Sequence, residues 1–161
     1  MQLLRPESVE EAVAALGDGA VALGGGTDLV PLLRDRIVEA ETLVELRRAI
    51  PNEIWRRTPT STSPSTSSAP FSIGAGATLA ALEADSEIPA ALREACRLAA
   101  SPQLRAMGTI GGNLIQATRC WYWRLKFPCY LHGGEICHAK EGQHREHAIF
   151  GNERCASAHP S

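Results

Sequence analysis

Apolar and polar positions in the first fifty residues alternate between a helical and an extended pattern. Residues 8–16 predict a helix, because Ser8 and Glu11 can form a capping box and the apolar side chains fall on one face. The pattern then predicts a strand over residues 20–23, a helix over residues 27–35 that begins at Thr27 or Asp28, and a strand over residues 42–46. This alternation is typical of an α/β fold.

Residues 58–70 interrupt the pattern with a run of Ser, Thr and Pro and a single Ala. Such a composition cannot bury enough apolar surface to fold by itself. We therefore expect a mobile loop that separates two lobes or forms the tip of a hairpin.

The alternation resumes after residue 70. It predicts a strand that runs into a turn over residues 71–77, a helix over residues 78–85 capped by Thr78, a helix over residues 88–101, and a helical turn that begins near Pro102. The longer helix has one apolar face, formed by Leu92, Ala95, Cys96 and Ala99. We expect Cys96 to be a small buried apolar side chain and not a metal ligand.

Composition narrows the class of protein. The 161 residues are 44% hydrophobic and carry a formal net charge of −2, which suffices for one core or two small lobes and argues against nucleic acid as a partner. No run of eighteen apolar residues predicts a membrane span. The N-terminal residues lack a basic region followed by an apolar stretch, so we expect a cytoplasmic protein unless a partner carries it out folded.

Four of the five cysteines lie in the last 43 residues, 119–161, together with all five histidines. An odd number of unevenly placed cysteines favours reduced thiols and metal ligation over a disulfide framework. The spacing of these four cysteines fits neither paired CxxC zinc ligands nor the common ferredoxin run, so the residues alone leave zinc and an iron–sulfur cluster both open. The four candidate ligands are Cys120, Cys129, Cys137 and Cys155.

Two glycine-rich elements are candidates for contacts with a nucleotide. The first follows a predicted strand and precedes a helix, where glycine lets the backbone approach a ligand closely. The second combines adjacent glycines with a Thr and an Asn, which suit contacts to a pyrophosphate or a ribose. The elements comprise Gly24, Gly25, Gly26, Thr27, Asp28 and Leu29 in the first, and Thr109, Ile110, Gly111, Gly112 and Asn113 in the second.

Taken together, the runs ALGGGTDLVPLLR, IGAGATLAALE and SPQLRAMGTIGGNL resemble the FAD-binding subunit of the xanthine dehydrogenase family of molybdenum hydroxylases. The resemblance implies a two-lobed α/β (α+β) FAD-binding domain. It places the flavin pyrophosphate between the two glycine elements, with Gly24 to Leu29 and Thr109, Gly112 and Asn113 around FAD. No His or Cys in either element offers a covalent attachment point for the flavin.

The segment after the second element resembles an inserted loop found in family members similar to 4-hydroxybenzoyl-CoA reductase and periplasmic aldehyde oxidoreductase. The matching runs are RCWYWRLKFPC, GGEICHAKEG, HAIFG and CASAHPS. The resemblance implies a 4Fe-4S cluster on the four cysteines, with the neighbouring aromatic residues excluding water. The family motif continues as HPSD, so the resemblance also implies a chain truncated at Ser161.

The resemblance implies the following organisation: a small lobe over 1–57, the loop 58–70, a second, incomplete lobe over 71–118, and the cluster loop over 119–161. The implied role is electron transfer between 2Fe-2S clusters and a small-molecule acceptor through FAD. The partners would be a molybdopterin-binding large subunit and a 2Fe-2S small subunit. The alternative function is a non-enzymatic interaction module whose loop is stapled by zinc.

Overall fold

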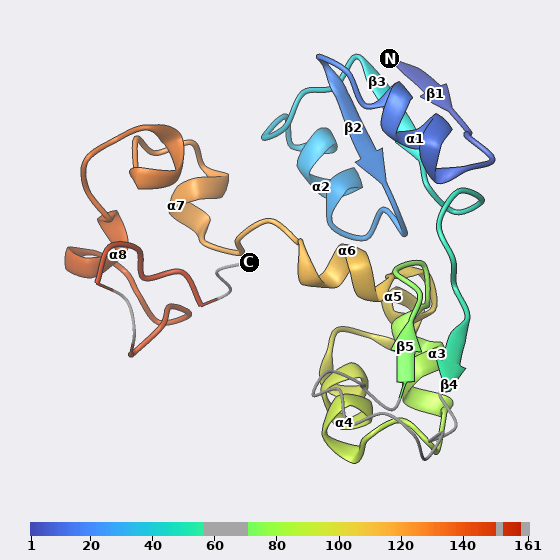
Figure 1. Ribbon diagram of the computed structural model, residues 1–161. Coiled ribbons are helices and arrows are strands. Elements are labelled where there is room, and N and C mark those ends of the chain that lie inside the picture. Colours follow the sequence, from blue (N-terminus) through green and yellow to red (C-terminus); the bar gives the residue numbers. More distant parts are fainter. Residues whose placement is uncertain (57–70, 151–152, 159–161) are drawn as a thin grey trace, which may run out of the picture.

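The computed structural model describes residues 1–56, 71–150 and 153–158 (Figure 1). The Ser/Thr/Pro-rich run predicted over residues 58–70 lies outside these residues, as does His159. No helix in this part of the chain is both long enough and apolar enough to cross a membrane.

The first lobe is a parallel sheet with two helices, as the alternating pattern predicted. Its elements are β1 (Gln2–Leu4), α1 (Val9–Ala15), β2 (Ala20–Leu23), α2 (Leu29–Arg34) and β3 (Thr42–Glu45). The strand order is β1-β3-β2, so β3 is central, and Thr42 pairs with both Gln2 and Ala20. Val44 of β3 is fully buried against Ala12 of α1, which forms the core of this lobe.

The second lobe has an antiparallel pair of strands covered by helices. Its elements are β4 (Ile54–Arg56), β5 (Phe71–Ile73), α3 (Leu79–Ala84), α4 (Ala90–Leu98) and α5 (Pro102–Met107). Thr78 caps α3 by accepting a hydrogen bond from the Ala81 N–H, as predicted. The buried residues of this lobe form a separate core of Leu79, Leu82, Ile88 and Cys96.

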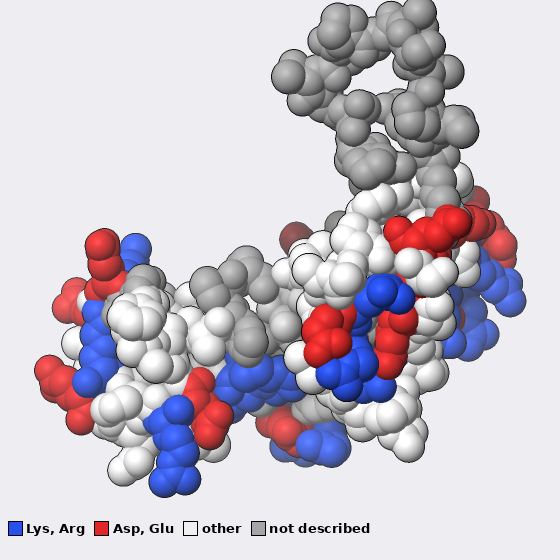
Figure 2. All heavy atoms as spheres, turned by 90° about the horizontal axis from the view of Figure 1, so that it is seen from below, with Lys and Arg blue, Asp and Glu red and all other residues white. Residues whose placement is uncertain are grey.

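The cysteine-rich segment forms a third body set apart from the two lobes (Figure 1). Helix α6 (Ile110–Leu114) leads into it from between the lobes, and its short elements are α7 (Trp121–Arg124), a 3₁₀ turn (Tyr130–His132) and α8 (His138–Glu141). On the face seen in Figure 2, the described acidic and basic side chains lie in mixed groups, in keeping with the small net charge.

The structure differs from the sequence prediction at several elements. Strands β1 and β4, of three residues each, were not predicted. The second glycine element, for which no helix was predicted, forms the cap and most of α6 (Ile110–Leu114). Ala95, expected on the apolar face of α4, is exposed, whereas Cys96 on the same helix is buried.

We expect Cys96→Ser to lower the free energy of unfolding by about 1–3 kcal/mol, because a hydroxyl would be left without a partner in an apolar core. Cys96 is 3% exposed, and burial raises the pKa of its thiol. Urea denaturation measures the change. Ala95→Ser, on the exposed side of the same helix, is the control and should cost about 0.5 kcal/mol or less. Equal losses in the two variants would show that Cys96 is not a core residue.

Candidate functional site

The first glycine element lies against the start of the second and the backbone that directly precedes it. A β-carbon on Gly25 would lie 1.8 Å from the carbonyl oxygen of Met107, and one on Gly24 would lie 3.1 Å from Thr109 Oγ1. Gly26 adopts a φ of +75°, a backbone conformation that residues other than glycine rarely take. The first element can therefore lie against the second only because these positions carry no side chain.

The second element is fixed in place from the opposite side. The N–H groups of Ile110 and Gly111 donate to the carbonyl oxygens of Ala77 and Ala75, over 2.8 Å and 3.0 Å. The hydroxyl of Thr109, itself only 8% exposed, accepts from the Gly112 N–H over 3.2 Å and caps α6. The element thus bridges the first glycine loop and the turn that precedes α3.

A cleft of about 980 Å³ opens where the two elements meet. This size is at the upper end of the range for small-molecule and cofactor sites. All the residues that the sequence predicted as cofactor contacts line this one cleft: Gly24, Gly25, Gly26, Thr27, Asp28, Leu29, Thr109, Gly111, Gly112 and Asn113. The structure therefore brings together positions that are about eighty residues apart in the chain.

Other residues of the cleft were missed by the sequence analysis. Arg119 adds a cation from the start of the cysteine-rich segment, and Ala117 lies beside it. Ala100 has a φ of +66°, a strained conformation for a residue with a side chain, and strain of this kind often marks functional sites. The sequence carried no signal for Ala100, whereas Arg119 could have been noted as a lone cation between two predicted sites.

The four cysteines of the last segment converge on a second, smaller pocket. Cys120, Cys129, Cys137 and Cys155 all line it, and all are free thiols. Gly133, with a φ of +76°, and Gly134 make the tight turn between Cys129 and Cys137. A β-carbon on Gly134 would lie 2.0 Å from the carbonyl oxygen of Pro128. The space between the walls is about 10 Å³, roughly what one water molecule occupies.

The sulfur of Cys120 lies among hydrogen-bond donors. Burial raises the pKa of the Cys120 thiol, while the backbone N–H groups of Trp123 and Tyr122 donate toward it and act in the opposite direction. His147 Nε2 lies 3.1 Å from the same sulfur. Burial, and secondarily His144, lowers the pKa of His147. Its Nδ1 is buried with no partner among the described residues, which favours the neutral tautomer that donates from Nε2 to the sulfur.

Aromatic rings form much of the remaining wall. Tyr122, Trp123 and Tyr130 line the pocket. Trp121 meets the ring of His147 edge-on at 4.8 Å, and Phe127 meets Tyr122 edge-on at 5.3 Å. Trp121 and Phe127 both contact the ring of Tyr122 and do not themselves line the pocket.

The described residues form no metal-binding group. In residues 1–56, 71–150 and 153–158, no three His, Cys, Asp or Glu side chains form a group that could hold one ion. The alternative prediction of a zinc-stapled interaction module therefore finds no support in the described residues.

Comparison with known proteins identifies relatives of most of the chain. The model of a family described as "FAD binding domain in molybdopterin dehydrogenase" matches residues 1–121. The aldehyde oxidoreductase FAD-binding subunit PaoB of Escherichia coli K12 is 34% identical over 149 residues. That match covers 89% of the chain, so it extends past residue 121 into the cysteine-rich segment. The carbon monoxide dehydrogenase medium chain of Afipia carboxidovorans is 38% identical over 115 residues, 68% of the chain.

Solved structures show the same fold. The reconstituted CO dehydrogenase from Oligotropha carboxidovorans has a TM-score of 0.59 and 34% identity over 71% of this chain and 39% of its own. Quinoline 2-oxidoreductase from Pseudomonas putida 86 has a TM-score of 0.55 and 26% identity over the same shares of the two chains. The chain spans 44% of the length of PaoB and 37% of the Afipia medium chain.

We expect Gly25→Ala to destabilise the fold by about 3 kcal/mol or more, because the added methyl group would meet a backbone oxygen that no side-chain rotation can move. Chemical denaturation of the protein without cofactors measures the effect. Gly17→Ala is the control, since a β-carbon there meets nothing within 4 Å and should leave the stability unchanged or raise it by up to about 1 kcal/mol. A Gly25→Ala protein as stable as the control would contradict the close contact of the two elements.

Proposed function

This chain belongs to the family of FAD-binding domains in molybdopterin dehydrogenases, and from that premise we propose that it is the flavin-binding part of an electron-transfer subunit in a molybdenum hydroxylase. The observation that carries the proposal is the single cleft of about 980 Å³ lined by both glycine elements. The chain would be an oxidoreductase subunit that binds FAD and leaves substrate oxidation to a partner.

FAD fits the residues that line the cleft. The glycines of both elements let the backbone approach a pyrophosphate, and the Thr109, Asn113 and Thr27 side chains offer polar contacts. Arg119 adds the positive charge that suits a phosphate. When bound, FAD would accept and donate electrons either singly or in pairs. The residues of this chain position the flavin and shield it from water.

The partners follow from the relatives. Their printed names describe subunits of aldehyde oxidoreductase and carbon monoxide dehydrogenase. We propose that this chain likewise assembles with a molybdopterin-binding large subunit and a 2Fe-2S small subunit, and delivers electrons to a small-molecule acceptor. We also propose that residues 58–70 separate the two lobes and that the cysteine-rich segment begins at residue 119. The cytoplasmic location stays a prediction.

We further propose that the four loop cysteines hold one 4Fe-4S cluster. The proposal rests on four free thiols that line one pocket, whose other walls are mainly aromatic and apolar. Each of the four thiolates would bind one iron of such a cluster. When bound, such a cluster exchanges single electrons.

Gly112→Val tests the flavin site. A side chain at this position would project beside Thr109 Oγ1, which lies 3.0 Å from the β-carbon position, and would intrude on the cleft. We expect the affinity for FAD to fall by about tenfold or more. Flavin fluorescence measures the dissociation constant, and Gly17→Val, away from the cleft, is the control. Flavin binding at the wild-type level in Gly112→Val would show that the site is misplaced.

The flavin-loaded wild-type protein tests whether the flavin is bound without a covalent link. The cleft contains neither His nor Cys among the residues described. Acid precipitation of the flavin-loaded protein should therefore release all the FAD into the supernatant, whereas flavin that remains with the polypeptide would contradict the prediction.

The cluster proposal predicts a difference between the loop cysteines and Cys96. Each of Cys120→Ser, Cys129→Ser, Cys137→Ser and Cys155→Ser should lower the iron and sulfide content or leave a smaller cluster, because one iron would lose its thiolate. Cys96→Ser should keep the full content. Iron and sulfide analysis with low-temperature paramagnetic resonance of protein prepared without oxygen measures both. One zinc in place of iron, or loss of iron in Cys96→Ser alone, would overturn the assignment.

A further inference from the structure

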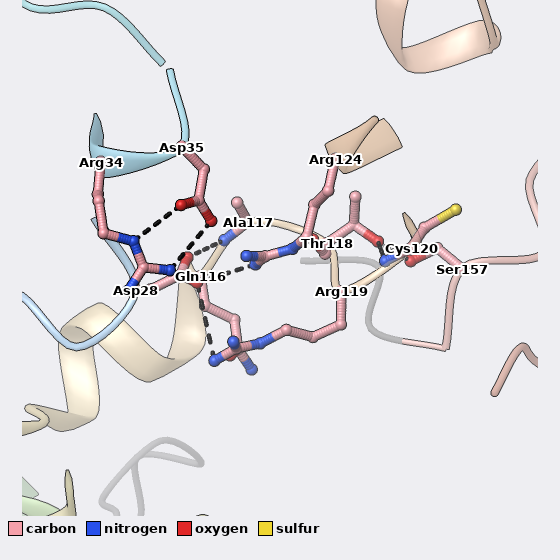
Figure 3. A network of polar contacts seen from close by, with 10 residues as sticks. All are labelled: Asp28, Arg34, Asp35, Gln116, Ala117, Thr118, Arg119, Cys120, Arg124 and Ser157. Carbon is pink, nitrogen blue, oxygen red and sulfur yellow. Dashed lines mark hydrogen bonds and ion pairs between the residues drawn. The ribbon is translucent and has the colours of Figure 1, made fainter. Parts of the chain in front are cut away.

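Asp28 stands at the N-terminal cap of α2 but does not cap that helix. An Asp at this position usually accepts a hydrogen bond from a backbone N–H of the first helical turn. Here no such bond forms. The carboxylate instead accepts from the Ala117 N–H over 2.8 Å and from Arg124 Nη2 over 3.1 Å, as Figure 3 shows. Asp28 therefore directs its charge toward the cysteine-rich segment and away from its own helix.

The ion pair between Asp28 and Arg124 is shielded from solvent. Their side chains are 18% and 19% exposed, whereas those of the neighbouring Arg34–Asp35 pair are 73% and 47% exposed. Charges in contact at such partly buried positions interact more strongly than those of exposed pairs. Removing one partner also leaves the other without compensation. Arg119 adds a second cation, 3.7 Å from the same carboxylate oxygen.

The polar contacts continue from Arg124 to the cysteine pocket. Arg124 Nε donates to the Thr118 carbonyl over 3.0 Å, and the Thr118 hydroxyl accepts from the Cys120 N–H over 3.2 Å. The same hydroxyl makes a short contact with the Ser157 hydroxyl. Figure 3 shows this path from Asp28 to Cys120 and Ser157. Asp28 lines the large cleft, and Cys120 and Ser157 line the cysteine pocket, so the network joins the two sites.

From this geometry we infer that Asp28 and Arg124 form a latch that fixes the cysteine-rich segment against the first glycine element and links the two sites. One oxygen of Asp28 is engaged by Arg124 of the segment and the other by the Ala117 N–H just before it, which makes Asp28 a positioning residue and not a direct flavin contact. The inference rests on the proposed binding of FAD and a cluster. Occupation of one site then stabilises the other, and linkage requires the effect to be reciprocal.

The test compares Asp28→Asn, Arg124→Gln and the double variant, each loaded with iron, sulfide and FAD. The measured quantity is the rate at which iron is lost to a chelator, with and without saturating FAD. In the wild type, FAD should slow this loss by about fivefold or more, on the order of the coupling found between the affinities of two linked sites. Both single variants should lose the effect of FAD, and the double variant should behave as they do because the two residues act as one unit.

Arg34→Gln is the matched control, since it removes an exposed ion pair on the same helix and should leave the effect of FAD intact. If FAD protects the iron equally in Asp28→Asn and the wild type, the latch is wrong. If Asp28→Asn weakens FAD binding even in protein that holds no iron, Asp28 is a flavin contact and the inference fails.

A readout that needs no cofactor separates the latch from the proposed function. Hydrogen exchange of the Ala117 N–H in the full chain should be slower in the wild type than in Asp28→Ala, which has no side-chain acceptor. A wild-type chain that takes up neither FAD nor iron overturns the proposed function but leaves this difference in exchange as support for the latch. Equal exchange in the two proteins overturns the latch whatever the cofactor content.

Discussion

The contact of Gly25 with the Met107 carbonyl is the constraint on which the rest of the structure depends. Each lobe has its own buried core, so apolar packing within the lobes does not by itself fix how they meet. Backbone atoms can approach this closely only where no side chain intervenes. The approach sets the position of Thr109 against Gly24, and with it the floor of the cleft and the start of α6.

The cysteine-rich segment is held by a different kind of interaction. It buries few apolar side chains, chiefly Ala139, Ala156 and Cys129, and leaves Ile149 and Phe150 more than 80% exposed. Its order depends on aromatic contacts around Tyr122 and on polar contacts to Asp28 and Thr118. A segment with so small an apolar core is the kind that bound metal stabilises. The ligands come together only in the folded loop, so the free energy of metal binding adds to the free energy of folding.

Particular residues show how far the sequence analysis reached. The caps at Ser8 and Thr78 were visible as local motifs, and each accepts the expected hydrogen bond. The grouping of both glycine elements around one site came from the family resemblance, and the structure lines a single cleft with them. Strand β1 was missed because its three residues are exposed and pair only through β3, about forty positions away.

The sequence by itself determined helices α1 to α5, strands β2, β3 and β5 and the α/β class, because caps and apolar periodicity act over a few neighbouring residues. It also supplied the glycines without which the two elements could not touch. Only the tertiary structure decided what Asp28 does: its local setting predicts a helix cap, yet its partners are Ala117 and Arg124, 89 and 96 positions away. Such a choice depends on which groups folding brings within hydrogen-bonding distance in a partly buried place, and no local pattern encodes it.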